Sequence, residues 1–125
     1  AQVAEPRKPS AEESEEALRR RKRGNDLYEA RDFEGAAEHY TSAIKAAPSS
    51  LLHSNRAAAY MMLGWWDQAY RDTKAALRRE PGNEKALERH GKVCLARDDL
   101  DGALEAAARL EAAAPEEEEE EEERK

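Results

Sequence analysis

Small and apolar positions recur along this chain with a period of about 34 residues. In each unit a small residue is followed by an aromatic or sulfur-containing position, and about ten residues later an alanine lies in a second apolar run. A proline closes each unit, and Pro48, Pro81 and Pro115 are 33 and 34 residues apart. Repetition at this period is typical of stacked helix-turn-helix units. The pattern therefore predicts three such units.

These runs predict six helices, at about residues 15–30, 33–46, 50–63, 66–79, 84–96 and 99–113. Polar side chains precede several of them, and an oxygen at that position accepts hydrogen bonds from amides that the helix leaves unpaired. Gly64 is expected to turn the chain between the third and fourth helices. The expected capping residues are Ser10 with Glu13, or Ser14, for the first helix; Asp32 for the second; Ser49 or Ser50 for the third; and Asn83 for the fifth.

Composition divides the chain into three parts. Residues 1–14 contain prolines among charged and small residues, with too little apolar surface to fold alone, and are expected to be a disordered linker. Residues 15–115 form the repeat domain, with units at about 17–49, 50–83 and 84–115. Residues 116–125 are expected to be an acidic disordered tail.

The charge of the chain is concentrated in that tail. The formal net charge is -7, but the first 115 residues carry 19 basic and 20 acidic groups, so the folded part is close to neutral. This disfavours a nucleic-acid binder. Cys94 is the single cysteine, which excludes an internal disulfide, and no apolar run is long enough to span a membrane. We expect a monomer in the cytoplasm, with the nucleus or an organellar stroma as alternatives.

Packing expectations follow from residue size. Small residues at equivalent positions would let paired helices approach closely, and large apolar residues would fill the remaining gaps. Leu100, Leu104 and Leu110 are expected to be partly uncovered at the last helix pair. The small residues are Gly24, Ala57, Ala58, Gly91, Ala36, Ala69 and Ala103, and the large ones are Tyr28, Phe33, Tyr40, Tyr60, Trp66 and Leu100.

The sequence from about Ala17 to Pro115 resembles tetratricopeptide repeats. The resemblance implies an all-α fold of three helix-turn-helix repeats forming a right-handed superhelical solenoid, with the first helix of each repeat on the concave side. Trp65 departs from the usual turn residue, and Leu110 replaces a small one. The matching positions are Gly24, Leu27, Ala36, Tyr40, Ala43 and Pro48; Ala57, Tyr60, Ala69, Ala76 and Pro81; and Gly91, Ala103 and Pro115.

Cationic and amide side chains recur on the three first helices. Arg21 and Asn25 are four residues apart, as are Lys85 and Arg89, and Asn55 lies on the middle helix. A four-residue step returns to the same helix face, so these side chains are expected to meet in one groove. Such a set suits a C-terminal aspartate, because its two carboxylates each require donors.

The arrangement looks like the dicarboxylate clamp of co-chaperone tetratricopeptide domains. That resemblance implies a protein-interaction adaptor binding the C-terminal Glu-Glu-Val-Asp of heat-shock protein 90, heat-shock protein 70, or both. Arg21 stands where the family usually has lysine. Its planar guanidinium replaces a point charge, which alters the geometry of the contact with a carboxylate. By the same resemblance, Tyr28, Ala58 and Met61 would border the pocket for the upstream peptide residue.

Several other interpretations compete with the clamp. The polar residues could simply solvate helix faces, and the domain could be a structural scaffold that joins a larger assembly through its convex face, Trp65 and the uncovered last helix. The basic run 19–23 could be an import signal, although its side chains point in every direction around a helix. The tail could compete weakly for the clamp cations.

The sequence gives no support for catalysis or for a cofactor. His39, His53 and His90 lack metal-ligand spacing, so no metal site is expected. Cys94 is expected in the core, His90 near a repeat junction and His39 on the surface. No nucleophile and base pair is apparent, and an enzyme is the least favoured class.

Overall fold

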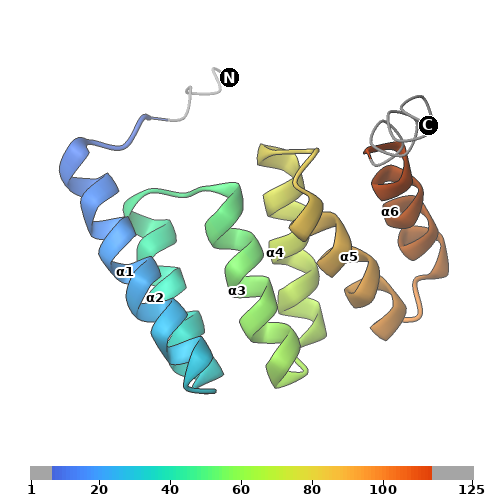
Figure 1. Cartoon of the computed structure of the whole chain (residues 1–125), viewed down its shortest axis with the longest axis horizontal. Coiled ribbons are helices and arrows are strands. Elements are labelled where there is room, and N and C mark those ends of the chain that lie inside the picture. Colours follow the sequence, from blue (N-terminus) through green and yellow to red (C-terminus); the bar gives the residue numbers. More distant parts are fainter. Residues whose placement is uncertain (1–6, 114–125) are drawn as a thin grey trace, which may run out of the picture.

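The computed structural model describes residues 7–113, and every regular element in that range is an α-helix. The helices form three antiparallel pairs arranged in chain order (Figure 1), which confirms the predicted all-α solenoid. Each helix packs on its pair partner, and α2 and α4 also pack on the first helix of the next pair. The bounds are α1 (Ala11–Glu29), α2 (Phe33–Ala46), α3 (Ser50–Leu63), α4 (Trp66–Arg79), α5 (Glu84–Ala96) and α6 (Leu100–Ala113).

Capping side chains fix most of the helix starts. Ser10 and Glu13 form a reciprocal capping box, so α1 begins at Ala11 and residues 11–14, assigned above to the linker, are helical. Asp32, Ser49 and Asn83 each accept a hydrogen bond from a first-turn amide, as predicted. The acidic tail and Pro115 lie outside the described residues.

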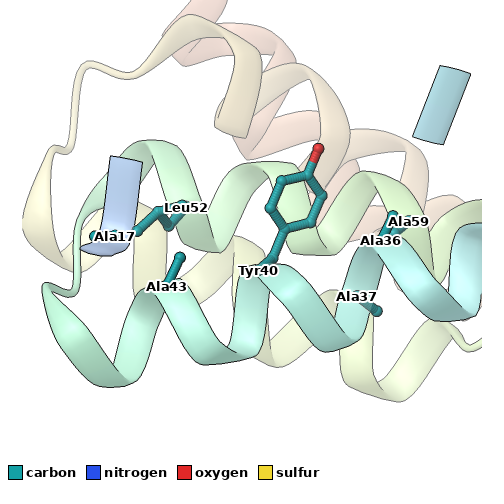
Figure 2. Packing of buried hydrophobic residues seen from close by; sticks show 7 residues of the cluster. All are labelled: Ala17, Ala36, Ala37, Tyr40, Ala43, Leu52 and Ala59. Atoms are coloured by element: carbon teal, nitrogen blue, oxygen red, sulfur yellow. The ribbon is translucent and has the colours of Figure 1, made fainter. Parts of the chain in front are cut away.

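Tyr40 occupies the centre of the first core. It projects from α2 between Ala17, Ala43 and Leu52 on one side and Ala36 and Ala59 on the other (Figure 2). The side chain is only 2% exposed. Gly24 lies directly against the ring, since a Cβ atom there would be 2.7 Å from Tyr40 Cε1. The predicted close approach of α1 and α2 is therefore confirmed, and a glycine permits it.

The equivalent glycine of the third unit has no such role. A Cβ atom at Gly91 would lie 3.6 Å from the Cβ of Ala106, which is ordinary van der Waals contact. The other small residues are buried as expected: Ala36, Ala57, Ala58, Ala69 and Ala103.

Two expectations at individual positions were wrong. Of the two expectations for Leu100, that it fills a gap is wrong and that it is partly uncovered is confirmed: it is 62% exposed, because it begins α6 at the edge of the last pair. His39 is half-buried, and its Nδ1 atom is buried without a hydrogen-bond partner in residues 7–113. By contrast, Leu104 is uncovered as expected, and Cys94 is fully buried.

His90 lies at a repeat junction, as predicted. Its ring stacks on Tyr70 of α4 at 5.3 Å, and its Nδ1 atom is 2.8 Å from Thr73 Oγ1. None of the described helices combines the length and apolar character that a bilayer crossing requires.

Candidate functional site

A hollow of about 240 Å³ opens between the first helices of the three repeats. Three of the five residues predicted to form the clamp meet there, although they come from helices far apart in sequence. Asn25 comes from α1, Asn55 from α3 and Arg89 from α5. The remaining lining residues are Tyr28, Glu29, Tyr40 and Ala58.

A side chain of α2 holds the amide of Asn25 in place. Tyr40 Oη donates a 2.6 Å hydrogen bond to Asn25 Oδ1. With its oxygen engaged, the Asn25 amide keeps two N–H donors that make no hydrogen bond within residues 7–113. Burial raises the pKa of Tyr40, Tyr28 adds to the rise, and the positive charges of Arg89 and Arg21 act to lower it. The phenol therefore remains a donor at neutral pH.

Arg89 is fixed on the opposite wall by α3. Its Nη1 atom donates to the backbone oxygen of Ser54 at 3.0 Å and to Ser54 Oγ at 2.7 Å. Ser54 is 1% exposed, so this anchor is rigid. Nε and Nη2 of Arg89 make no hydrogen bond within residues 7–113, which leaves them for an anion.

The two other predicted cations do not line this hollow. Arg21 is one turn before Asn25 on α1 and lines an adjoining hollow of about 170 Å³ between α1 and the start of α3. Its Nε atom is buried and has no hydrogen-bond partner in the described part of the chain. Lys85 is exposed on α5, one turn before Arg89, and the four-residue spacing places it on the same helix face.

Of the three residues expected to border the pocket for the upstream peptide residue, two line the hollow and one does not. Tyr28 and Ala58 line the hollow, and Tyr28 packs edge-on against Phe33 with ring centroids 5.1 Å apart. Met61 is half-buried in the last turn of α3 and does not line it. Glu29 adds a carboxylate at the rim, four residues after Asn25.

Sequence reasoning did not identify Tyr40, Ser54 or Glu29 as site residues. For Tyr40 a signal existed: a buried tyrosine hydroxyl needs a partner, whereas a phenylalanine would pack equally well. Ser54 and Glu29 carry no comparable signal, because their roles depend on side chains from other helices or on the shape of the hollow.

No protein-family model matches the chain. The Sgt2 tetratricopeptide repeat domain from Aspergillus fumigatus has a similar structure, with a TM-score of 0.77 and 30% sequence identity over 90% of this chain and 74% of that one. The chain belongs to the tetratricopeptide repeat family. The resemblance inferred from the repeat positions is thereby confirmed.

A second solved structure is also similar to this tetratricopeptide repeat domain. It is the first tetratricopeptide repeat domain of Spaghetti (RPAP3) bound to the HSP90 peptide SRMEEVD, with a TM-score of 0.80 and 28% identity, covering 82% of each chain. Among curated relatives, human sperm-associated antigen 1 is 34% identical over 94 residues, which is 75% of this chain. The chain spans about a tenth of that relative's length.

Proposed function

We propose that this tetratricopeptide repeat domain is a non-enzymatic adaptor that binds the C-terminal Glu-Glu-Val-Asp segment of heat-shock protein 90 or 70. The proposal rests on the convergence of Asn25, Asn55 and Arg89 from three helices around one hollow. It is supported by the similarity to a domain solved with the HSP90 peptide SRMEEVD. A cytoplasmic location is part of the proposal.

Each polar residue has a role that follows from its donors. Arg21, Lys85 and Arg89 bind carboxylates of the terminal aspartate and the preceding glutamates, since their charges neutralise the peptide. Asn25 and Asn55 fix the terminal residue and the extended backbone through directional amide bonds. Tyr28 and Ala58 contact the side chain upstream of the two glutamates, and Met61 acts more remotely, through the packing of α3.

The expected affinity is modest. Charge-assisted hydrogen bonds contribute about 1.5 to 3 kcal/mol each, but a short flexible peptide loses conformational and translational entropy when it docks. The balance corresponds to a Kd of the order of 1 μM, which is about -8 kcal/mol.

The decisive experiment titrates the heptapeptide SRMEEVD into the wild type and two lysine variants by calorimetry. Lys85→Ala should weaken binding at least tenfold because it removes a carboxylate partner. Lys45→Ala is the matched control, since Lys45 is exposed on α2 and lines a separate hollow with Trp65. A Lys85→Ala loss below twofold would exclude the clamp.

A peptide with an amidated C-terminus adds a second test. Amidation removes one of the two carboxylates at the terminal residue, so binding should fall at least tenfold. Titration of a heat-shock protein 70 tail peptide alongside SRMEEVD then establishes which chaperone is preferred. If neither tail shifts the NMR signals of Asn25 and Asn55, the convex-face scaffold becomes the better assignment.

A further inference from the structure

Trp65 stands where the other two repeats have a capping aspartate. Asp32 and Asp99 are the equivalent residues, 33 before it and 34 after it. Asp32 accepts a 3.0 Å hydrogen bond from the Gly35 amide, and Asp99 accepts one of 3.0 Å from the Gly102 amide. Trp65 is at the start of α4 and makes no side-chain capping bond. The second repeat has therefore replaced a helix cap by an aromatic side chain that is 41% exposed.

The Trp65 ring is held in a defined orientation. It stacks on Tyr60 with centroids 5.8 Å apart and an interplanar angle of 28°. Tyr60 in turn lies 5.7 Å from the guanidinium carbon of Arg56, within cation–π range. Arg56 is fixed by two 2.7 Å hydrogen bonds to Asp72, which is buried. Trp65 is thus supported from behind by Tyr60 and Arg56, and one face of its ring is left for a ligand.

Trp65 and Tyr60 form one side of a hollow of about 380 Å³, whose other side is α2. Glu34, Ala37 and Glu38 line it from the first two turns of α2. Figure 1 shows that α2 begins at the same end of the molecule at which α4 begins, so these carboxylates lie at the Trp65 end. Lys45 lines the hollow three turns further along.

The two carboxylates are available to a ligand. Glu34 and Glu38 are exposed, and neither belongs to an ion pair within residues 7–113. An aromatic face beside two unpaired carboxylates favours a cation. Arginine fits better than lysine, because its planar guanidinium stacks on an aromatic ring and donates to carboxylates with the same group.

We propose that this outer hollow docks an arginine side chain from an extended segment of a partner protein. The guanidinium stacks on the outer face of Trp65 and donates to Glu34 and Glu38. The outer hollow therefore selects a ligand of opposite charge to the acidic peptide. That peptide is proposed for the inner groove, which is the hollow lined by Asn25, Asn55 and Arg89. The domain would then join two partners, one through each face.

The test uses NMR titration of the full 125-residue chain with acetyl-Gly-Arg-Gly-Arg-Gly-amide. The control peptide has citrulline at both arginine positions, which keeps the shape and removes the charge. The arginine peptide should shift the Trp65 indole N–H and the amides of Glu34 and Glu38, with a Kd near millimolar. The citrulline peptide should bind at least fivefold more weakly.

Trp65→Asn separates this site from diffuse attraction to acidic residues elsewhere. Asparagine caps helices and is uncharged, so the new cap offsets the lost stacking on Tyr60 and the variant should stay folded. The Kd of the arginine peptide, followed through the amide shifts of Glu34 and Glu38, should rise at least fivefold. The Kd of SRMEEVD should change by less than twofold. Leu104→Asn, at another exposed apolar position, should change the affinity for neither the arginine peptide nor SRMEEVD. Equal binding of the two peptides, or undiminished arginine binding by Trp65→Asn, would overturn the proposal.

Discussion

Tyr40 Oη donates a 2.6 Å hydrogen bond to Oδ1 of Asn25, and this bond joins the centre of the core to the floor of the inner groove. One residue thus packs the first repeat and orients a proposed ligand-binding amide. Tyr40 is a positioning residue, since it fixes which end of the Asn25 amide faces the peptide.

Tyr40→Phe should reduce SRMEEVD affinity about fivefold, because a neutral hydrogen bond contributes roughly 1 kcal/mol and the freed amide can turn its oxygen toward the peptide. The measurement is calorimetric titration of the variant. In an Asn25→Ala background the same substitution should have no further effect on affinity. A full fivefold loss in that background would mean that Tyr40 acts through the core alone.

Gly24→Ala should destabilise the domain by about 1 to 3 kcal/mol, because the added methyl overpacks the buried Tyr40 ring. Gly91→Ala is the matched control at the equivalent repeat position. It should stabilise the fold by about 0.5 to 1 kcal/mol, since it meets only ordinary contact and alanine favours a helix. Urea unfolding measures both, and equal effects would contradict the packing account.

Asp72→Ala should cost about 3 kcal/mol of unfolding free energy. Asp72 is 3% exposed and accepts two hydrogen bonds from Arg56, so its loss leaves a half-buried guanidinium without its counter-charge. Asp67→Ala, on the same helix, removes an exposed pair with Arg97 and should cost less than about 1 kcal/mol. Similar losses in the two variants would argue against a special role for the buried pair.

The stability of the domain should fall as the pH drops below about 6.5, the ordinary pKa of histidine. Burial lowers the pKa of His90, and the charge of Lys74 lowers it further. Between the folded and unfolded pKa values the unfolded chain binds more protons, so unfolding becomes easier as the pH falls through that window. At pH values above that window, the contribution of His90 to the free energy of unfolding is fully present.

The measurement compares urea unfolding at pH 7.5 and pH 5.0 for the wild type and His90→Gln. The variant should show a smaller loss of stability between the two pH values, because the titrating group is gone while the carboxylates remain. An identical loss in both proteins would show that His90 does not contribute to the pH dependence.

The helices and their order could be predicted from the sequence because their signals are local. Prolines at a 34-residue period, capping side chains such as Asp32 and Asn83, and a glycine at the third helix end act within one turn of the backbone they organise. The start of α1 was placed too late because the capping box at Ser10 lies in a stretch with few apolar residues.

Tertiary structure decided what the local signals could not. Spacing placed Asn25, Asn55 and Arg89 on suitable helix faces, but their meeting around one hollow depends on how three helices pack. The Tyr40 bond to Asn25 joins residues 15 apart on different helices. The exposure of Leu100 and the hollow between Trp65 and α2 likewise depend on how the helices pack. Local chemistry thus determined the repeats, and side-chain contacts between helices determined the sites.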